Sequence, residues 1–146
     1  MKRLGLLAFA IAVHLSADAA HADWIGFAEK IYDGDTFSLC DESVCNKIRI
    51  CGIDAPEIGD EGSSQATAAL AGFLKGRTVQ CIQVGKGTVC DGRSTPINKD
   101  WIVAQCFFGT KDVARELVKG RFVCEWIKFS GGAYGGVSCP EELKAR

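Results

Sequence analysis

The sequence holds only two histidines, His14 and His21, and both lie within its first 22 residues. The chain from Asp23 onward therefore has none. This excludes a Ser-His-Asp triad, a Cys-His pair and the common histidine-containing zinc sites from that part. The C-x-x-C pattern is also absent, which argues against a thioredoxin-like motif or a zinc ribbon. Chemistry after residue 22 has to rest on carboxylates, Arg, Lys, Tyr, Cys or a bound ion.

An excess of positive charge is lacking as well. The chain has 17 basic and 18 acidic residues. Without residues 1–22, which carry two of the bases and one of the acids, 15 and 17 remain, a formal net charge of −2. If nucleic acid binds here, it binds at a local site or through a metal and not on a basic surface.

Residues 1–22 have the features of a secretory signal peptide. Two basic residues precede an apolar run from Leu4 to about Val13, and Ala20-His21-Ala22 matches the A-x-A cleavage pattern. The run is too short for a stable transmembrane anchor, although an uncleaved anchor or a buried helix is the alternative. We expect residues 1–22 to be removed and residues 23–146 to form one domain. The mature protein is then secreted or periplasmic, without stable insertion in a membrane.

Eight cysteines follow residue 22, and an even count in an exported chain of this size indicates disulfides. Buried free thiols, the alternative, suit a cytosolic protein better. Cys81 and Cys106 fall at similar inward positions on successive expected strands, so we expect them to pair. Cys40 and Cys45 flank an expected hairpin turn and are placed to close it. The pairs Cys124–Cys139 and Cys51–Cys90 follow by elimination.

Most of the pattern after residue 23 is that of strands. Alternation predicts two strands in residues 24–40, a hairpin turn at 41–46, and further strands at 47–53, 77–84 and 101–109. Helical spacing predicts a helix within 61–76, with Ser63 or Ser64 as its cap and Gly76 as its stop, and a second helix at 110–120. Residues 121–129 read as a short extended piece, and Pro140 as the start of a last helix. Five strands with a helix between the third and fourth predict an α+β, mainly β fold: a five-stranded OB-type Greek-key barrel.

Asp33-Gly34-Asp35-Thr36 interrupts the first strand pair. Taken alone, this stretch is typical of a turn or bulge, since Asp and Gly are poor strand formers. The spacing of an EF-hand calcium loop is missing.

A second acidic stretch, RICGIDAPE at residues 49–57, changes that interpretation. Strands joined by a hairpin pair antiparallel, so Asp35 and Asp54 should approach each other at one rim of the barrel. Two close carboxylates need a cation or a shared proton, and Ca²⁺ is the simplest solution. Arg49 forms paired bonds to phosphate oxygens, and Glu57 is placed to orient or deprotonate a water. These are the parts that phosphodiester hydrolysis needs.

In this order and spacing, DGDT, RICGIDAPE, a helix, IVAQC and a helix ending in LVKG resemble the staphylococcal nuclease (thermonuclease) family. The resemblance covers roughly Trp24 to Gly120. It implies a five-stranded OB barrel with helices that cuts single-stranded DNA and RNA with calcium, and we expect a monomer.

The resemblance also implies roles for individual residues. Asp35 and Asp54 would be carboxylate ligands of the ion, and the backbone carbonyl of Ala55 a third ligand. Glu57 would hold the attacking water, as general base or orienter, and Arg49 would bind the scissile phosphate.

One departure from the family concerns its second phosphate-binding arginine, because the ungapped position holds Trp101. Three alternatives remain open: Arg93 reaches back from a lengthened loop, Lys99 substitutes, or the role is lost. Arg93 sits on a glycine-containing loop, so we expect its reach to be possible but not preorganised.

Two function classes compete. The first is the nuclease, which uses every acid and Arg49 together. The second is a barrel of the same fold that binds nucleic acid or protein and no longer cuts. A disulfide-rich structural module explains the cysteines but not the acids. Tyr134, in a Gly-rich loop, is a candidate for stacking on a base or for ordinary packing, while for Trp126 packing is the favoured reading.

Overall fold

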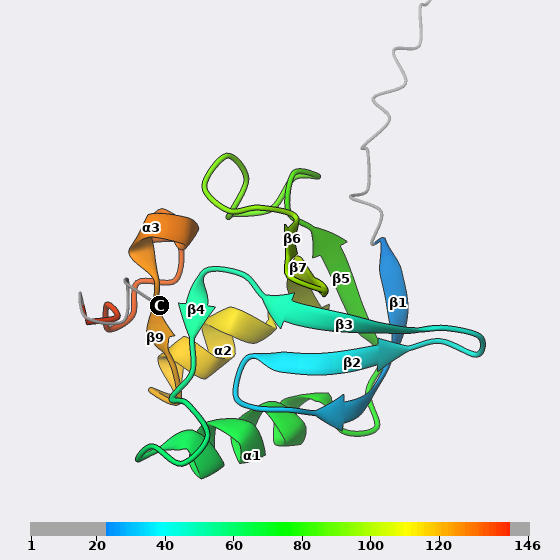
Figure 1. The fold of residues 1–146 in the computed structure, drawn as a ribbon, viewed down its shortest axis with the longest axis horizontal. Helices are drawn as coiled ribbons and strands as arrows, with labels where there is room; N and C mark the ends of the chain where they lie inside the picture. Colours follow the sequence, from blue (N-terminus) through cyan, green and yellow to red (C-terminus); the bar gives the residue numbers. More distant parts are fainter. Residues whose placement is uncertain (1–22, 141–146) are drawn as a thin grey trace, which may run out of the picture.

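The computed structural model describes residues 23–140 (Figure 1). The expected signal peptide and the expected helix after Pro140 lie outside the described residues. Helices and strands follow in the order β1 (Trp24–Ile31), β2 (Thr36–Cys40), β3 (Cys45–Ile50), β4 (Ile53–Asp54), α1 (Ser63–Leu74), β5 (Val79–Gln83), β6 (Ile97–Asn98), β7 (Trp101–Phe108), β8 (Lys111–Asp112), α2 (Val113–Lys119), β9 (Cys124–Glu125) and α3 (Ile127–Ser130).

Five strands close into a barrel. Neighbours pair in the order β3-β2-β1-β5-β7, and β7 returns to pair with β3. The closing pair is parallel and the other four are antiparallel. This closed order with one parallel pair is the OB-type topology, so the predicted mainly β fold is confirmed. The short strands β6 and β8 add to β7.

The barrel and its helices share a main apolar core, and a second, smaller buried cluster is formed by Cys51, Val84, Cys90 and Val103. Helix α1 contributes Ala66, Leu70 and Leu74, which recur every four residues and so lie on one face of the helix. Helix α2 packs against α1 and against β7, and it adds Leu117 to the same core. The helices thereby cover one side of the barrel interior, and the turn between β1 and β2 lies against α1.

The two long helices are present where the sequence predicted them, but the cap of α1 differs. Its N-cap is Gly62 with φ +87°, and no side chain caps it. Ser63 is the first helical residue and donates its backbone N–H to Asp60, so the prediction of a serine cap is wrong. Helix α2 begins after Asp112, whose side chain accepts from the backbone N–H of Arg115, and it ends at Gly120 as predicted.

All four expected disulfides form: Cys40–Cys45, Cys51–Cys90, Cys81–Cys106 and Cys124–Cys139. Cys81 and Cys106 are direct partners in the pairing of β5 with β7. Four disulfides in a chain of this size are typical of an oxidising compartment. None of the helices within residues 23–140 has the length and apolar character needed to cross a bilayer.

Candidate functional site

The turn between β1 and β2 is held together by Asp33. Its Oδ1 accepts hydrogen bonds from the backbone N–H of Asp35 at 3.0 Å and of Thr36 at 2.8 Å, and from the Thr36 hydroxyl at 2.6 Å. Gly34 lies against α1, where an added Cβ would come within 2.5 Å of the Ala66 Cβ. The expected turn is therefore present, and its function is to direct Asp35 inward, where that residue is only 3% exposed.

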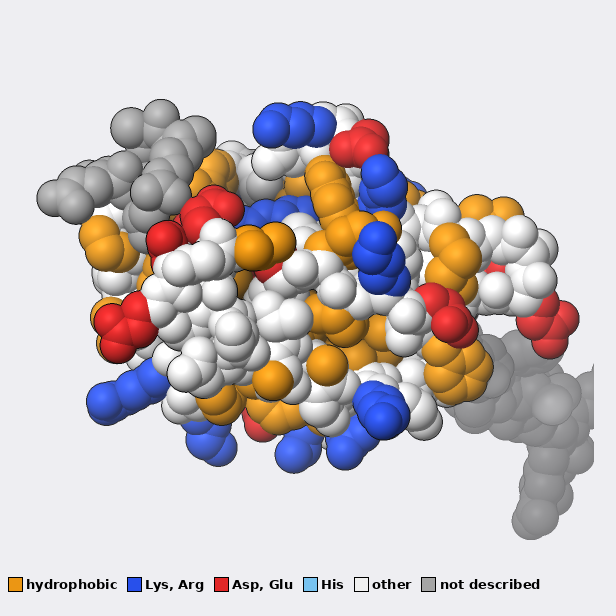
Figure 2. All heavy atoms as spheres, turned by 60° about the horizontal axis from the view of Figure 1, so that its bottom comes forward, with side chains coloured by type: hydrophobic (Ala, Val, Ile, Leu, Met, Phe, Trp, Pro, Cys, Tyr) orange, Lys and Arg blue, Asp and Glu red, His pale blue; other side chains and the backbone are white. Residues whose placement is uncertain are grey.

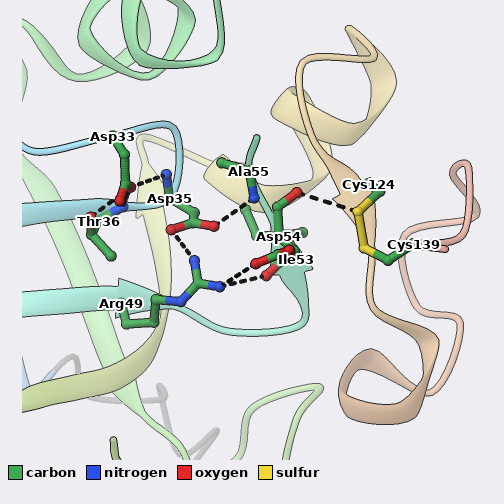
Figure 3. A network of polar contacts seen from close by, with 9 residues as sticks. All are labelled: Asp33, Asp35, Thr36, Arg49, Ile53, Asp54, Ala55, Cys124 and Cys139. Carbon is green, nitrogen blue, oxygen red and sulfur yellow. Dashed lines mark hydrogen bonds and ion pairs between the residues drawn. A yellow bond between two sulfur atoms is a disulfide. The ribbon is translucent and has the colours of Figure 1, made fainter. Parts of the chain in front are cut away.

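Arg49 joins the turn to β4 (Figure 3). Its Nη1 forms an ion pair with Asp35 Oδ1, and its Nη2 lies 2.9 Å from Asp54 Oδ1 and 3.3 Å from the Ile53 carbonyl oxygen. The other Asp35 oxygen accepts from the backbone N–H of Ala55 at 2.7 Å. Two carboxylates from separate segments thus meet at one guanidinium, as the antiparallel pairing of Thr36 with Arg49 predicts.

The three paired side chains are largely shielded from water, with exposures of 5% for Asp35, 16% for Asp54 and 19% for Arg49. The pKa of the Arg49 guanidinium lies below its ordinary value, because burial lowers it by more than the charges of Asp54 and Asp33 raise it. An arginine stays protonated under such conditions, so the site holds fixed charges.

An open cavity of about 250 Å³ adjoins this network. Its lining includes four acids, Asp33, Asp35, Asp54 and Glu57, and two bases, Arg49 and Lys99. Four negative and two positive side chains leave two negative charges, which favours a further cation in the cavity.

The donors present fit a hard divalent ion. Asp35 and Asp54 offer the carboxylate oxygens that Ca²⁺ prefers, and Ala55 lies beside them on the cavity wall. No group of three or more His, Cys, Asp and Glu side chains within residues 23–140 is arranged to hold a metal. A bound ion would therefore need backbone carbonyls and water in addition to the two carboxylates.

Lys99 and Arg93 flank Arg49 from different cavities. Lys99 lines the acidic cavity from the turn between β6 and β7, where its φ is +55°. Arg93 lines an adjoining cavity of about 500 Å³, which Arg49 and Asn98 also line. The structure thus brings Lys99 to the acids and Arg93 to the other side of Arg49, while Trp101 occupies the ungapped position in the acidic cavity.

The backbone of the loop that carries Arg93 is fixed at several points. Cys90 is bound to Cys51, and its carbonyl accepts from the backbone N–H of Arg93 at 3.0 Å. The Asp91 carboxylate accepts from two further backbone N–H groups of the loop, each at 2.7 Å. The guanidinium itself lies against Gly131, where an added Cβ would come within 2.8 Å of Arg93 Nε.

The aromatic residues differ from expectation. Tyr134 is only 7% exposed and packs in the barrel core, so the prediction that it stacks on a base is wrong and the packing interpretation is confirmed. Trp126 instead lines the Arg93 cavity together with Phe129, with ring centroids 4.9 Å apart. Phe129 was not predicted as a site residue, although its spacing of three residues from Trp126 is the signal of two side chains on one helix face.

The outer surface agrees with a local site. On the face in Figure 2, Lys and Arg side chains stand as separate groups among acidic and apolar ones and form no continuous basic area. A comparison with models of protein families finds no match for this chain, and a comparison with curated proteins finds none either.

Proposed function

We propose that the protein is a secreted or periplasmic, calcium-dependent nuclease of the staphylococcal nuclease type, which hydrolyses phosphodiester bonds in single-stranded DNA and RNA. The observation that carries the proposal is the convergence of Asp35 and Asp54 on Arg49 beside a cavity that Glu57 and Lys99 also line. The four disulfides support export to an oxidising compartment.

Each residue has a task in this proposal. Asp35, Asp54 and the Ala55 carbonyl would hold Ca²⁺, which when bound polarises a phosphate oxygen and neutralises charge. Arg49 binds the non-bridging oxygens of the scissile phosphate through its planar fork of N–H groups. Glu57, exposed at the cavity rim, accepts a proton from the attacking water or orients that water.

The additional cations act on charge that develops during the reaction. Phosphoryl transfer places negative charge on the non-bridging oxygens, so a fixed cation near them stabilises the transition state more than the ground state. Arg93 and Lys99 line the two cavities that share Arg49. The anchored loop supports Arg93 as the replacement for the second arginine of the family.

The aromatic wall supports a nucleic-acid substrate. Trp126 and Phe129 line the cavity that also contains both arginines. The Trp126 Nε1–H is buried and has no hydrogen-bond partner among the described residues. Base stacking on such rings does not depend on sequence, which fits a nuclease without strict sequence preference.

A second candidate is a barrel that binds nucleic acid or protein and does not cut. It is favoured by the pairing of Arg49 with both carboxylates, since this arrangement is electrostatically stable without any metal.

The test uses the oxidised protein and a single-stranded oligonucleotide, with Ca²⁺ and with EDTA. We expect cleavage only with Ca²⁺. Asp35→Ala should lose Ca²⁺ binding, and Glu57→Gln should keep it and lose about 100-fold or more in rate, the scale of a positioned general base. Glu29→Gln, an exposed glutamate on β1, is the matched control and should behave as wild type. Binding of Ca²⁺ and oligonucleotide without fragments would establish the second candidate.

A further inference from the structure

Strand β4, which carries Asp54, lies outside the barrel sheet. It forms a two-stranded sheet with β9, in which Ile53 pairs with Glu125 and Asp54 pairs with Cys124. The backbone position of Asp54 therefore depends on β9, which follows it by about 70 residues in the chain.

A disulfide anchors β9 at the partner of Asp54. Cys124 is bound to Cys139, and its sulfur lies 3.4 Å from the Asp54 carbonyl oxygen (Figure 3). A disulfide sulfur has no proton to donate, so this is a packing contact. The backbone of Cys139 also donates to the Glu125 carbonyl at 2.9 Å, and the Glu125 N–H donates to Val137 at 2.7 Å. The segment around Cys139 thus lies along β9 and holds it from the side.

The Glu125 side chain secures the same segment from within. It is only 1% exposed. Its Oε1 accepts from the Ser130 hydroxyl at 2.6 Å and from the Tyr134 N–H at 2.9 Å, and its Oε2 accepts from the Gly136 N–H at 3.0 Å. Burial raises the pKa of Glu125, but these hydrogen bonds lower it by more than burial raises it. The pKa therefore lies below its ordinary value, and the group stays ionised. The buried carboxylate therefore gathers residues 130–136 around β9.

We propose that the Cys124–Cys139 disulfide and the Glu125 carboxylate are positioning groups for Asp54, so that closure of this one disulfide sets how strongly the site holds Ca²⁺. Without the crosslink, β9 is held to its neighbours by backbone hydrogen bonds and by the Glu125 carboxylate, and Asp54 sits on a strand of only two residues. Its backbone is then held less firmly, and the Arg49 ion pairs are left to fix its carboxylate relative to Asp35. The statement about Ca²⁺ rests on the proposed function, whereas the statement about β4 does not.

The experiment compares two disulfide variants of the mature protein, Cys124→Ser/Cys139→Ser and the control Cys40→Ser/Cys45→Ser, whose bond closes the β2–β3 hairpin. The first readout is hydrogen exchange of the Ala55 backbone amide without metal, because that amide bonds to Asp35 across the site. We expect exchange about tenfold or more faster in the first variant and unchanged in the control. Equal exchange in both variants would overturn the proposal.

The second readout is Ca²⁺ binding by calorimetry. We expect the affinity to fall by about 10–100-fold in the Cys124/Cys139 variant, the usual effect of losing a group that orients a ligand, and to stay at the wild-type value in the control. Excess Ca²⁺ should restore its turnover. A wild-type protein that binds no Ca²⁺ counts against the proposed function alone, since amide exchange still decides whether β4 is positioned by β9.

Glu125→Gln repeats the test with all four disulfides intact. The glutamine NH₂ group would face a backbone N–H that donates to the carboxylate in the wild-type protein, and that hydrogen bond is lost. Exchange at the Ala55 amide should therefore be faster, as in the Cys124/Cys139 variant. Asp112→Asn replaces another buried carboxylate, which caps α2 and accepts from Gln105, and should leave Ala55 unchanged. If Asp112→Asn has the same effect as Glu125→Gln, the effect is general destabilisation and the proposal is wrong.

Discussion

Arg49→Met removes the cation that pairs with both Asp35 and Asp54 and leaves two shielded carboxylates facing each other. Removing one partner of a buried ion pair costs about 3–5 kcal/mol, because the remaining charge stays desolvated. The Arg49 side chain is 19% exposed, so solvent screening reduces the cost to the lower end, about 3 kcal/mol. For a domain of this size that corresponds to a decrease of roughly 10–15 °C in Tm when metal is chelated.

Calcium should have the opposite effect on the same variant. In the wild-type protein the guanidinium competes with an incoming ion for the two carboxylates, and Arg49→Met removes that competition. At the same Ca²⁺ concentration, the Tm should therefore rise more in the variant than in the wild type. At 100 times its own Kd the variant gains about 2.7 kcal/mol of stability. Turnover should fall by about 10²–10³, since a phosphate-binding cation is lost.

Thermal unfolding followed by circular dichroism, with EDTA and with excess Ca²⁺, measures both effects. The control is Lys47→Met on the same strand, whose partner Asp100 lies at 2.6 Å but whose ion pair is exposed, with 46% and 64% of the side chains accessible. Such a pair contributes about 1 kcal/mol or less. An Arg49→Met protein that unfolds at the wild-type temperature in EDTA would refute the structural role of the pair. Equal stabilisation of both proteins by Ca²⁺ would show that these carboxylates do not bind it.

Three further predictions concern the surroundings of the site. Arg93→Ala should lower turnover more than Lys99→Ala on the same oligonucleotide, because a guanidinium offers a fork of N–H groups and an amine offers a point charge. If neither variant changes the rate by more than about threefold, under 1 kcal/mol, these residues supply no transition-state cation. Asp91→Asn should lower the Tm at neutral pH and flatten its acid dependence. Burial raises the pKa of Asp91, but hydrogen bonds from its loop lower it from the ordinary value of 3.8 to about 2. The stabilisation by the ionised carboxylate is therefore full above pH 3.8 and is lost as the pH falls through about 2. Melting curves across this pH range measure the loss. Gly34→Ala should lower the free energy of unfolding by about 1–3 kcal/mol and reduce activity, because the new Cβ meets Ala66 and displaces the turn. A denaturant titration that gives the wild-type free energy of unfolding would contradict this.

The barrel was predictable from the sequence because its signals are local. Alternation marks the strands, and the short hairpin between Cys40 and Cys45 makes β2 and β3 neighbours. That pairing in turn brings Asp35 near Arg49. The disulfides followed once two pairs were assigned, since few alternatives remained.

The segment after α2 was less predictable because tertiary contacts decide its conformation. Residues 121–129 read as one extended piece, but they form the two-residue strand β9 and then the helix α3. The turn into α3 depends on a hydrogen bond from the backbone N–H of Trp126 to the carbonyl oxygen of Gly52, which lies far away in the sequence. The backbone N–H of Tyr134 donates a hydrogen bond to the Glu125 carboxylate, which holds this residue at the core. No pattern within the segment itself encodes either contact.

Two of the four disulfides join strands within the barrel, and the other two attach segments that lie outside it. The barrel and its helices bury a continuous core, which a domain of this length can supply by itself. The loop with Arg93 and the segment around Cys139 lie outside the barrel and are rich in glycine, so ordering them costs more conformational entropy than ordering other segments. Each is attached by one disulfide, at Cys51 two residues after Arg49 and at Cys124 opposite Asp54. A crosslink restricts the unfolded chain and so lowers the entropy that ordering costs. In this chain these two crosslinks therefore stabilise the segments that lie next to Arg49 and Asp54 in the candidate site.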